Sequence, residues 1–358
     1  MASRLALHRF ASLSTMVDVV VIAGTKRGGH RVSLPDLRQM AGRAGRKADA
    51  SDVVVRVVCD SDAEYDRVSV GMENAKLLVK SSLGETKAVA FAVLAEIEMG
   101  LVTSEEEICE WFSRSLAARQ GADCDGEEVM KWLLFVRAVE KHDDKVVCTS
   151  LGRLAARYYY DPEDVSMWTE NFERLNAFDY MDDNIALAWA IGSVPCGRNC
   201  YAPARWSKKE LFDYFISELE DRGLSCLSGC LDSCLLWWRM LGGPNCGWSK
   251  AEIDARRSDF GRLSNVLFGL SHDRHWELES ELSDLETAVA YSCPIFAASL
   301  CRLDGVGKTM ACELYSMGVR SVGDLQRMAE DCESEEMKNR ILGILKANES
   351  DAIGRGCL

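Results

Sequence analysis

The chain has 358 residues, of which 47% are hydrophobic, and it carries a formal net charge of −14. Its length is that of two or three ordinary domains, and its apolar content is enough to build a buried core in each, which excludes an intrinsically disordered protein. The acidic balance argues against a protein that coats nucleic acid indiscriminately, because phosphate contacts need concentrated Lys and Arg. Binding of DNA through local basic patches stays open.

Hydropathy and cysteine usage indicate the cellular compartment in which the protein is expected. No apolar run approaches the ~20 residues that a membrane span needs, so we expect no membrane segment. The 15 cysteines are scattered through apolar periodic segments, which is typical of a reducing, intracellular environment, cytoplasmic or nuclear. Two groups have four-residue spacing but no CxxC pair and no His partner, and we interpret them as small buried hydrophobes, with a metal site as the alternative: Cys196/Cys200 and Cys226/Cys230/Cys234.

The first 16 residues leave two interpretations open. They contain no acid, and they carry Arg4, His8 and Arg9 among several serines. This composition is typical of an organelle presequence, but a buried segment at the start of a truncated domain has the same character. We favour the second interpretation.

The N-terminal 70 residues have an α/β pattern. Two β-branched runs, at residues 17–24 and 52–59, are bounded by Gly, Asp and Ser and predict strands, the first of them buried on both faces. Between them, Leu34–Arg46 predicts a helix with Ser33 as its N-cap and Pro35 in its first turn. Strand, helix, glycine-rich turn and strand together predict an incomplete α/β domain over residues 1–70.

Residues 71–160 change to amphipathic helices and a small hairpin. Three helices are expected, the second opened by a capping box of Thr103 and Glu106, and a two-stranded wing follows them, which is the pattern of a winged-helix domain. The expected helices are Thr86–Met99, Thr103–Ala118 and Glu127–Glu140, the strands are Ala138–Lys141 and Lys145–Thr149, and a further helix, Leu151–Tyr160, leads out through Asp161-Pro162.

The remaining chain is helical. Over residues 161–295, apolar and aromatic residues recur at three- and four-residue spacing, as in Leu211, Phe215 and Leu219, and predict an all-helical bundle. Residues 296–358 contain glycine-marked turns between short helices and then a tail. The fold class expected for the whole chain is therefore mostly α and multidomain.

The sharpest signal is Gln39-Met-Ala-Gly-Arg-Ala-Gly-Arg46. Two arginines three residues apart, at a helix end next to a sheet, can direct both guanidinium groups at one polyphosphate, since Arg is always charged and binds oxyanions in a bidentate manner. The glycines allow the backbone to approach a ligand closely. We therefore predict that Arg43 and Arg46 contact a nucleotide, with a basic surface turn as the alternative.

This octapeptide resembles motif VI (QxxGRxGR) of superfamily 2 helicases, in the form of the Ski2-like DNA helicases of the archaeal repair type, which are related to the helicase half of DNA polymerase theta. The resemblance implies that Gln39, Arg43 and Arg46 face ATP across a cleft between two RecA-like domains, with one Arg as a finger on the γ-phosphate. It continues at Phe112–Gln120 and Leu151–Tyr158 and reaches from about residue 17 to about residue 330. It implies a partial RecA-like segment, a winged helix, a ratchet-like helical bundle and a helix-hairpin-helix module.

The segment Ser258–Phe268 resembles the ratchet helix of the same family. The resemblance implies that Arg262 contacts the backbone of a single DNA strand and that an aromatic residue about two turns later, for which Phe268 is the candidate, stacks on a base. Gly269 occupies a position near the expected aromatic, and Trp276 lies a further two turns on. A plain core or surface helix is the alternative.

The segment Leu303-Asp-Gly-Val-Gly-Lys-Thr309 carries a second signal. Its last three residues imitate the end of a Walker A loop, but that loop needs a preceding strand and a glycine at the position of Arg302. Gly-Val-Gly between two short helices instead predicts the turn of a helix-hairpin-helix. Its amides face one DNA phosphate without reading sequence, and the candidate residues are Gly305, Gly307, Lys308 and Thr309. A hairpin kept only for packing is the alternative.

The motifs that carry ATP hydrolysis are absent from this sequence. It contains neither GxxxxGK[ST] nor a DExH or DExD box. Without a phosphate-cradling loop and a Mg²⁺ site, γ-phosphoryl transfer lacks preorganised electrostatic stabilisation, so we expect no ATP hydrolysis by this chain alone. ATP and Mg²⁺ are expected to bind only with a first RecA-like domain, supplied upstream or on a separate chain.

Two functions from different classes follow. In the first, the chain is the C-terminal part of an ATP-dependent 3′–5′ DNA helicase that acts in DNA repair or at stalled replication forks, with single-stranded or forked DNA as its partner; the polarity is implied by the resemblance. In the second, it is a non-enzymatic DNA-binding or protein-interaction remnant of such a helicase. An RNA helicase of the same branch is less favoured, because the helix-hairpin-helix pattern is a device for contacting the DNA backbone.

Overall fold

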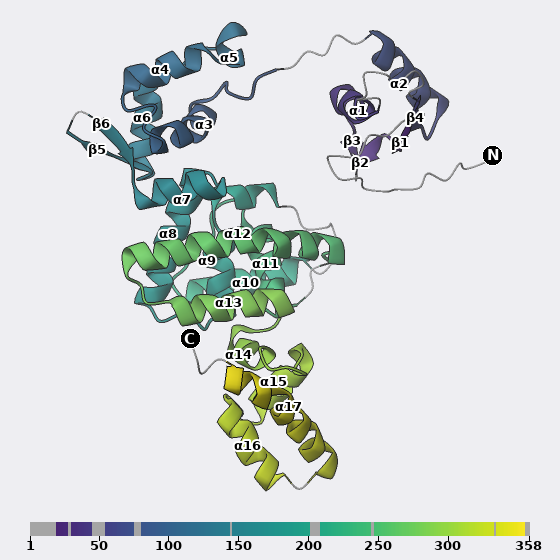
Figure 1. Ribbon diagram of the computed structural model, residues 1–358, viewed down its shortest axis with the longest axis vertical. Coiled ribbons are helices and arrows are strands. Elements are labelled where there is room, and N and C mark those ends of the chain that lie inside the picture. The colour runs from purple at the N-terminus through teal and green to yellow at the C-terminus, as the bar shows by residue number, and fades with distance from the viewer. Residues whose placement is uncertain are drawn as a thin grey trace. The chain divides into compact units, whose positions relative to one another are not determined.

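The computed structural model describes residues 19–27, 30–44, 54–74, 80–143, 145–200, 208–244, 247–332 and 334–354. Within these ranges helices dominate, and the strands form three separate two-stranded sheets, as Figure 1 shows. The expected mostly α fold is confirmed. The chain divides into two compact units, residues 1–80 and 81–358, while the expected division into four domains stays a prediction. No helix of the described ranges is long and apolar enough to cross a membrane.

The first unit contains a small parallel sheet. Strand β1 (Val19–Ala23) pairs with β4 (Val54–Val58), with Val19 opposite Val54, so both expected strands are present over their described residues. The expectation that the first strand is buried on both faces is wrong. Val19 and Val21 are 50% and 41% exposed, whereas Ile22 is buried, because helix α1 (Leu34–Ala41) packs on one face of this two-stranded sheet. A short hairpin of β2 (Lys26–Arg27) and β3 (His30–Arg31) lies between β1 and α1 in the chain.

Helix α1 begins as expected and ends early. The Ser33 hydroxyl accepts a hydrogen bond from the Asp36 amide and Pro35 lies in the first turn, but the helix ends at Ala41 with Gly42 as C-cap and does not continue to Arg46. Leu37 is fully buried and forms the core of the unit with Ile22 and with Val68 of α2 (Asp62–Asn74). At Gly71 of α2, a Cβ atom would lie 2.5 Å from a methyl carbon of Leu34, so α1 and α2 approach closely here and a larger residue would displace the Leu34 side chain.

The second unit opens with helices α3 (Thr86–Glu98), α4 (Glu105–Ser113), α5 (Leu116–Arg119) and α6 (Gly126–Phe135), followed by the antiparallel hairpin of β5 (Val139–His142) and β6 (Lys145–Cys148). Three expectations need correction. The second expected helix is broken, because the Ser115 hydroxyl caps a separate helix α5 by accepting from the Ala118 amide. The cap of α4 lies one residue later than expected, on Ser104, which accepts from the Glu107 amide. Helix α6 stops at Phe135, since Arg137 adopts a left-handed conformation (φ 59°) that turns the chain into β5.

Helix α7 (Ser150–Tyr158) joins the hairpin to the bundle through two close contacts at glycine residues. A Cβ atom on Gly152 would lie 1.9 Å from the carbonyl oxygen of Ala138, at the start of the hairpin. On the other side, a Cβ atom on Gly269 of α12 (Lys250–Arg274) would lie 2.6 Å from a methyl carbon of Leu154. Only glycine fits at either position without a shift of the surrounding atoms. The helix is therefore packed directly between the hairpin and α12.

The bundle surrounds a helix that is buried all round. Every residue of α9 (Asn184–Gly192) after Asn184 is buried, and α9 packs most extensively on α11 (Leu231–Met240), whose Cys234 backbone lies 2.7 Å from where a Cβ of Gly192 would be. The sequence of such a helix is apolar throughout because every face of the helix contacts other parts of the protein. The other members are α8 (Pro162–Ala177), a 3₁₀ turn η1 (Pro195–Asn199), α10 (Lys208–Asp221) and α13 (Glu279–Tyr291).

The cysteines with four-residue spacing are divided between the core and the surface. Cys200, Cys230 and Cys234 are buried, as expected for small hydrophobes, whereas Cys226 is half-buried and Cys196 is exposed. In the described part of the chain, no group of three or more His, Cys, Asp or Glu side chains could hold a metal ion.

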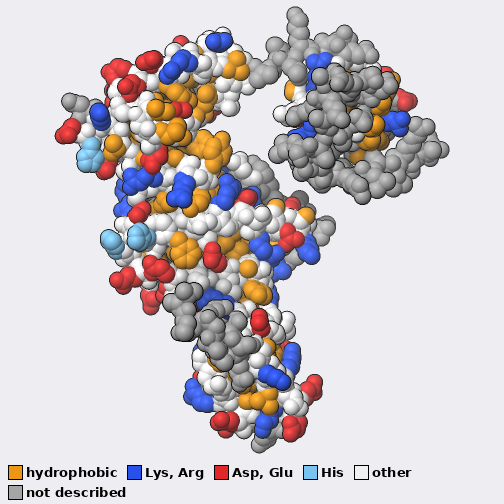
Figure 2. All heavy atoms as spheres, viewed as in Figure 1, with side chains coloured by type: hydrophobic (Ala, Val, Ile, Leu, Met, Phe, Trp, Pro, Cys, Tyr) orange, Lys and Arg blue, Asp and Glu red, His pale blue; other side chains and the backbone are white. Residues whose placement is uncertain are grey.

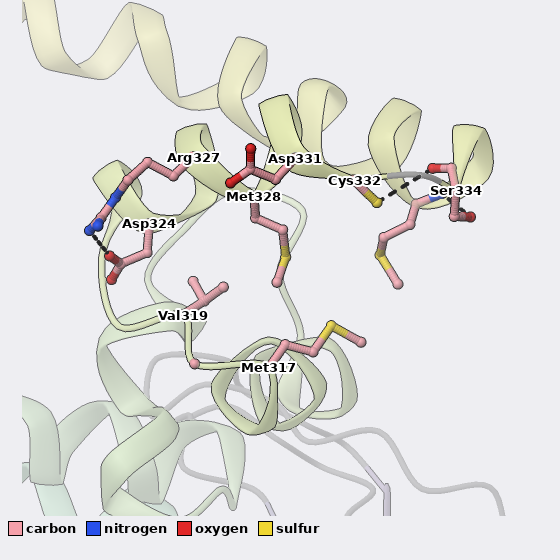
Figure 3. A pocket seen from close by; sticks show the side chains of 10 residues that line it. Met317, Val319, Asp324, Arg327, Met328, Asp331, Cys332 and Ser334 are labelled. Carbon is pink, nitrogen blue, oxygen red and sulfur yellow. Dashed lines mark hydrogen bonds and ion pairs between the residues drawn. The ribbon is translucent and has the colours of Figure 1, made fainter.

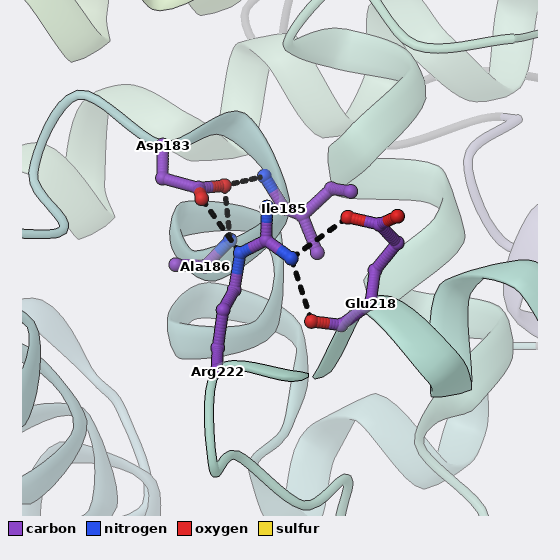
Figure 4. Close-up of polar contacts among 5 residues, drawn as sticks. All are labelled: Asp183, Ile185, Ala186, Glu218 and Arg222. Carbon is purple, nitrogen blue, oxygen red and sulfur yellow. Dashed lines mark hydrogen bonds and ion pairs between the residues drawn. The ribbon is translucent and has the colours of Figure 1, made fainter. Parts of the chain in front are cut away.

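One arginine fastens two bundle helices together (Figure 4). The guanidinium of Arg222, after α10, donates to Asp183 (Nε to Oδ2, 2.6 Å) and to Glu218 (Nη1 to Oε2, 2.8 Å). Asp183 in turn caps α9 by accepting from the amides of Ile185 and Ala186. A half-buried pair that is fully hydrogen-bonded is structural, and it distinguishes Arg222 from the exposed arginines of the bundle.

The C-terminal module contains two hairpin turns between short helices. The first turn, residues 302–307, lies between α14 (Ala298–Cys301), which follows a 3₁₀ turn η2 (Ile295–Ala297), and α15 (Lys308–Ser316). The second, residues 317–321, lies between α15 and α16 (Val322–Asp331), and α17 (Glu335–Gly354) packs against α16. The buried core of the second unit continues through this module to Ile344.

Candidate nucleic-acid interface

The described residues of the predicted nucleotide motif lie at the exposed end of α1. Gln39 and Arg43 are both exposed, and the Arg43 amide donates to the Met40 carbonyl just after the C-cap Gly42. The Arg43 guanidinium has no partner among the described residues, whereas Arg38 donates to the Met72 carbonyl and fastens α1 to α2. Arg46 lies outside the described residues. An unpaired guanidinium beside a parallel sheet is suited to meet an oxyanion, and the contact with ATP stays a prediction.

A loop of the same unit is fixed by a buried carboxylate that sequence reasoning missed. Thr25 is fully buried and its hydroxyl donates to Glu64 at the start of α2, which also accepts from the Asp60 amide at 3.0 Å. The Thr25 hydroxyl and then the Asp60 amide hold the pKa of the Glu64 carboxyl below its usual range. These bonds tie the segments that follow β1 and β4 together at one edge of the sheet.

Arg262 lies half-exposed on α12, held in place by residues from the end of α7. Its guanidinium carbon lies 5.0 Å from the centroid of the Tyr160 ring, Nη1 donates to the Tyr158 carbonyl at 3.3 Å, and Nη2 is 3.5 Å from Asp259. Burial raises the pKa of Tyr160 to about 12, so its phenol stays neutral. These contacts orient the guanidinium and leave about half of the Arg262 side chain open to solvent, as a phosphate contact requires.

Phe268, the expected stacking residue, lies on another side of the helix from Arg262. Six residues of helix place it about 120° around the axis, and its ring is half-buried against the core. Gly269, on the same side of the helix as Arg262, is covered by Leu154, and Trp276 is buried. The structure therefore brings Arg262 together with Tyr160 rather than with Phe268.

The end of α7 adds two arginines and an exposed aromatic to Arg262. Arg153 and Arg157, one turn apart and both exposed, lie on one face of α7; Arg153 donates to the Cys148 carbonyl and Arg157 lies over the Tyr158 ring. Tyr159 is 73% exposed in a left-handed conformation and meets Phe91 edge to face. Figure 2 shows Lys and Arg side chains gathered over the α7 region. Interleaved cations and aromatic rings suit a single nucleic-acid strand.

The first hairpin of the C-terminal module is open. Gly305 has φ +83°, which requires glycine, whereas Gly307 has an ordinary extended conformation and nothing within 4 Å of where a Cβ would be. Among the described residues, no acceptor faces the amides of Gly305 and Gly307. A glycine that neither conformation nor packing requires leaves room for a ligand to approach the backbone. The amides at the start of α15 complete a site of the kind that binds phosphate.

The other two residues expected at this hairpin differ from each other. Thr309 is exposed, but the Lys308 ammonium donates to the Ser292 carbonyl at 2.6 Å and is half-buried, so it fastens the hairpin to the end of α13. Asn348 of α17 holds the turn from the other side, since it accepts from the Asp304 amide and donates to the Asp304 carbonyl.

The second hairpin is closed by its own side chains. Gly318 has φ +90°, but the Arg320 amide donates to the Asp324 carboxylate at 2.9 Å, and the Ser321 hydroxyl caps α16. The Arg320 guanidinium lies 3.3 Å from the centroid of the Tyr315 ring. A carboxylate at the position that a phosphate would take repels DNA, so only the first hairpin offers an anion site.

Comparison with curated proteins gives this arrangement a context. The chain is homologous to archaeal Hel308 DNA helicases. It is 26% identical over 310 residues to the "ATP-dependent DNA helicase Hel308" of Thermoplasma acidophilum, which covers 83% of this chain and 44% of the relative. It is 28% identical over 162 residues to the protein of the same name from Thermoplasma volcanium. That alignment covers 44% of this chain and 24% of the relative. The chain thus spans less than half the length of these relatives. No protein-family model matches it.

The Hel308 homology does not by itself explain the tyrosines beside Arg262. Sequence reasoning used this segment for a predicted helix and for its resemblance to the family, although the two arginines four residues apart and the three consecutive tyrosines that end at Tyr160 were visible. That pattern of basic and aromatic residues was the available signal for a nucleic-acid surface. The approach of α7 to α12 was not visible, because it depends on a glycine contact between segments more than 100 residues apart.

Proposed function

We propose that the chain supplies the C-terminal, DNA-engaging part of an ATP-dependent 3′–5′ DNA helicase of the Hel308 type that acts in DNA repair or at stalled replication forks. The observation that carries this proposal is the homology to Hel308 helicases across 83% of the chain. The polarity, the cellular role, and the relation to the helicase half of DNA polymerase theta rest on resemblance and remain predictions. Single-stranded or forked DNA is the proposed partner.

Two surfaces of the second unit are proposed to hold the DNA strand. The first is formed by Arg262, Arg153 and Arg157 with the neighbouring tyrosines, where cations can meet phosphates and Tyr159 can stack on a base. The second is the open hairpin at Gly305–Gly307, whose amides and the start of α15 can bind one phosphate without regard to sequence. Phe268 and Lys308 are proposed to support these surfaces from behind, because both are half-buried against protein.

ATP and Mg²⁺ are proposed to act in the complete helicase through a first RecA-like domain. Gln39, Arg43 and Arg46 would then face the nucleotide across the cleft, with an arginine near the γ-phosphate. The 358-residue chain alone has no Walker A loop or DExH box and is proposed not to hydrolyse ATP. In a chain fused to such a domain, Arg43→Ala should abolish hydrolysis while leaving DNA binding intact. Hydrolysis that survives Arg43→Ala would remove this arginine from the nucleotide site.

The test of DNA binding is fluorescence anisotropy with a labelled single strand and a labelled fork, at salt concentrations from about 50 to 200 mM. Affinity is expected to fall steeply with salt, and Arg262→Ala should weaken it roughly fivefold to tenfold and reduce the salt dependence by about one phosphate contact. Arg274→Ala is the matched control, because it removes the same charge from the same helix about 18 Å away, where Arg274 pairs with Glu173. A folded chain that does not bind, or whose binding ignores salt, would reject DNA as its partner.

The binding experiment and the ATPase assay of the fused chain together separate the helicase from the alternative of a non-enzymatic remnant. A remnant that binds DNA would show the salt dependence but would gain no ATPase activity when fused to a first RecA-like domain. A remnant that binds protein only would show neither. The exposed Arg43, which has no partner among the described residues, is free to meet a nucleotide as the helicase proposal requires.

A further inference from the structure

A groove beside the second hairpin has the composition of a protein-docking site. It has a volume of about 660 Å³, within the range of ligand pockets, and it opens between the end of α15, one face of α16 and the start of α17 (Figure 3). Three methionines, one from each of these regions, dominate its lining. The residues that line it are Met317, Gly318, Val319, Asp324, Arg327, Met328, Asp331, Cys332, Ser334 and Met337.

The methionines are only partly covered by the protein. Met317 is 49% exposed, and Met328 and Met337 are half-buried, whereas Val319 is buried at 1% and forms the apolar base. Methionine side chains are flexible and polarisable, so they adapt their shape to an incoming apolar surface. Exposed thioethers over a buried base therefore fit an apolar ligand that inserts side chains between them.

The rim of the groove is acidic. The Arg320 amide and then the Ser321 hydroxyl hold the pKa of Asp324 below its usual range, so this carboxylate is ionised at neutral pH, and Arg327 pairs with it. Asp331, seven residues later on the same face of α16, is exposed and has no partner among the described residues. Exposed Glu335 and Glu336 begin α17 beside it. This charge repels the phosphates of DNA and attracts a cation.

The shape and charge of the groove favour a helix of a partner protein over a second copy of this chain. Asp324, Met328 and Asp331 follow the spacing of one helix face, and the two carboxylates are about 10 Å apart along it, so a second helix lying alongside can match them with apolar and basic residues at the same spacing. A second copy of the chain would bring the same acidic rim to a two-fold contact, and like charges would then face each other. A basic amphipathic helix meets neither obstacle.

We propose that this groove docks a short amphipathic helix of a partner protein, with apolar side chains between Met317, Met328 and Met337 and a lysine or arginine opposite Asp331. The module then has two separate faces. The open first hairpin serves DNA, and the groove beside the closed second hairpin serves protein. The docking proposal stands on the groove alone and does not depend on DNA binding.

The test uses the full chain and a fluorescein-labelled helical peptide of ~14 residues, about four turns, with leucines on one face and lysines flanking them. Fluorescence anisotropy should show saturable binding to the wild-type chain. A scrambled peptide of the same composition, which lacks the apolar face, and a peptide with Glu in place of Lys should each bind at least tenfold more weakly. Equal binding of the scrambled peptide would show that charge alone attracts it and would overturn the proposal.

Two variants locate the binding. Met328→Glu should weaken the peptide at least tenfold, while Leu342→Glu, an equally drastic change at an exposed position of α17 outside the groove, should not. Asp331→Asn, which changes no shape, should weaken the lysine peptide about threefold and reduce its salt dependence. Unchanged affinity in Met328→Glu and Asp331→Asn would reject the groove as the site. Dimerisation of the wild-type chain that Met328→Glu abolishes would instead identify a second copy as the occupant, and loss of DNA affinity in Met328→Glu would identify DNA; either result overturns the proposal.

Discussion

The two hairpins of the C-terminal module have the same turn but different surroundings. Each has a glycine in the left-handed region, Gly305 and Gly318, followed by a buried valine and a short helix. In the first, the residue before the helix is Gly307, and its amide has no acceptor among the described residues; in the second, Asp324 accepts the Arg320 amide. One carboxylate thus separates a turn that can bind a phosphate from a turn that excludes one.

The strongest test of this comparison is to close the first hairpin. Gly307 is the N-cap of α15 with extended dihedral angles, so Gly307→Asp introduces a capping carboxylate without strain. We expect affinity for single-stranded DNA to fall about tenfold or more, equivalent to about 1.4 kcal/mol, because the carboxylate occupies the phosphate position. Stability should rise by a few tenths of a kcal/mol. Anisotropy and thermal unfolding measure the two effects, with Gly307→Asn as the uncharged control. Undiminished affinity in Gly307→Asp would show that this hairpin does not hold phosphate.

The opposite test removes the cap of the second hairpin. The Ser321 hydroxyl accepts from the Asp324 amide at 3.2 Å, and Ser321→Ala should destabilise α16 by about 1 kcal/mol. DNA affinity should not change, since this turn is proposed to face protein. Differential scanning calorimetry and anisotropy would be compared on the same samples. A drop in DNA affinity as large as that of Gly307→Asp would mean that the two turns share one function.

A third prediction concerns the support of the open turn. Asn348 holds Asp304 through two hydrogen bonds, and Asn348→Ala should lower stability by about 0.5–1 kcal/mol. The looser turn should also bind DNA about threefold more weakly, because its amides are no longer preorganised. Hydrogen exchange at residues 304–307 should accelerate. If exchange accelerates while DNA affinity stays the same, the geometry of the turn is not what DNA contacts.

The smallest effect is in the pH dependence. The pKa of Asp324 is lowered from 3.8 in the folded chain, so the unfolded chain takes up the proton first and the contribution of this carboxylate is complete above about pH 5. That contribution is lost as the pH falls through the lowered pKa. The Arg320 amide resonance should therefore titrate with a midpoint below 3.8, and the Gly305 and Gly307 amides should not follow it. A midpoint above 3.8 would contradict the capping geometry.

The sequence predicted the elements of this chain better than their ends. Strands, the helix after Ser33, the three helices with a hairpin and the helical remainder were all visible in periodicity and turn residues. The end of α1 at Ala41 was not, because Gly42 and Gly45 permit either a helix or a turn. The break at Ser115 was missed for a similar reason, since a serine inside an apolar pattern caps a new helix only if the backbone turns there.

The candidate site was predicted less completely than the fold. Gly305 and Gly307 lie where the motif placed them, because a hairpin turn is a local structure. Phe268 was chosen by distance along the helix, and only the three-dimensional packing shows that its ring lies against the core and that Leu154 covers Gly269. Lys308 was expected at the phosphate but reaches Ser292 instead, a contact that depends on how α13 and α15 meet. The acidic cap of the second hairpin was visible as Ser321-x-x-Asp324.

The two glycines on either side of α7 have a mechanical consequence. At Gly152 the backbone of α7 directly meets the carbonyl oxygen of Ala138, and at Gly269 the methyl groups of Leu154 directly meet the backbone of α12, so α7 is held closely against both neighbours. No side chain at Gly152 can take up a displacement of the two-stranded hairpin, so α7 is expected to move with it, and the carbonyl of Tyr158 that accepts from Arg262 lies at the end of that helix. The hairpin, α7 and Arg262 are therefore expected to move together rather than independently.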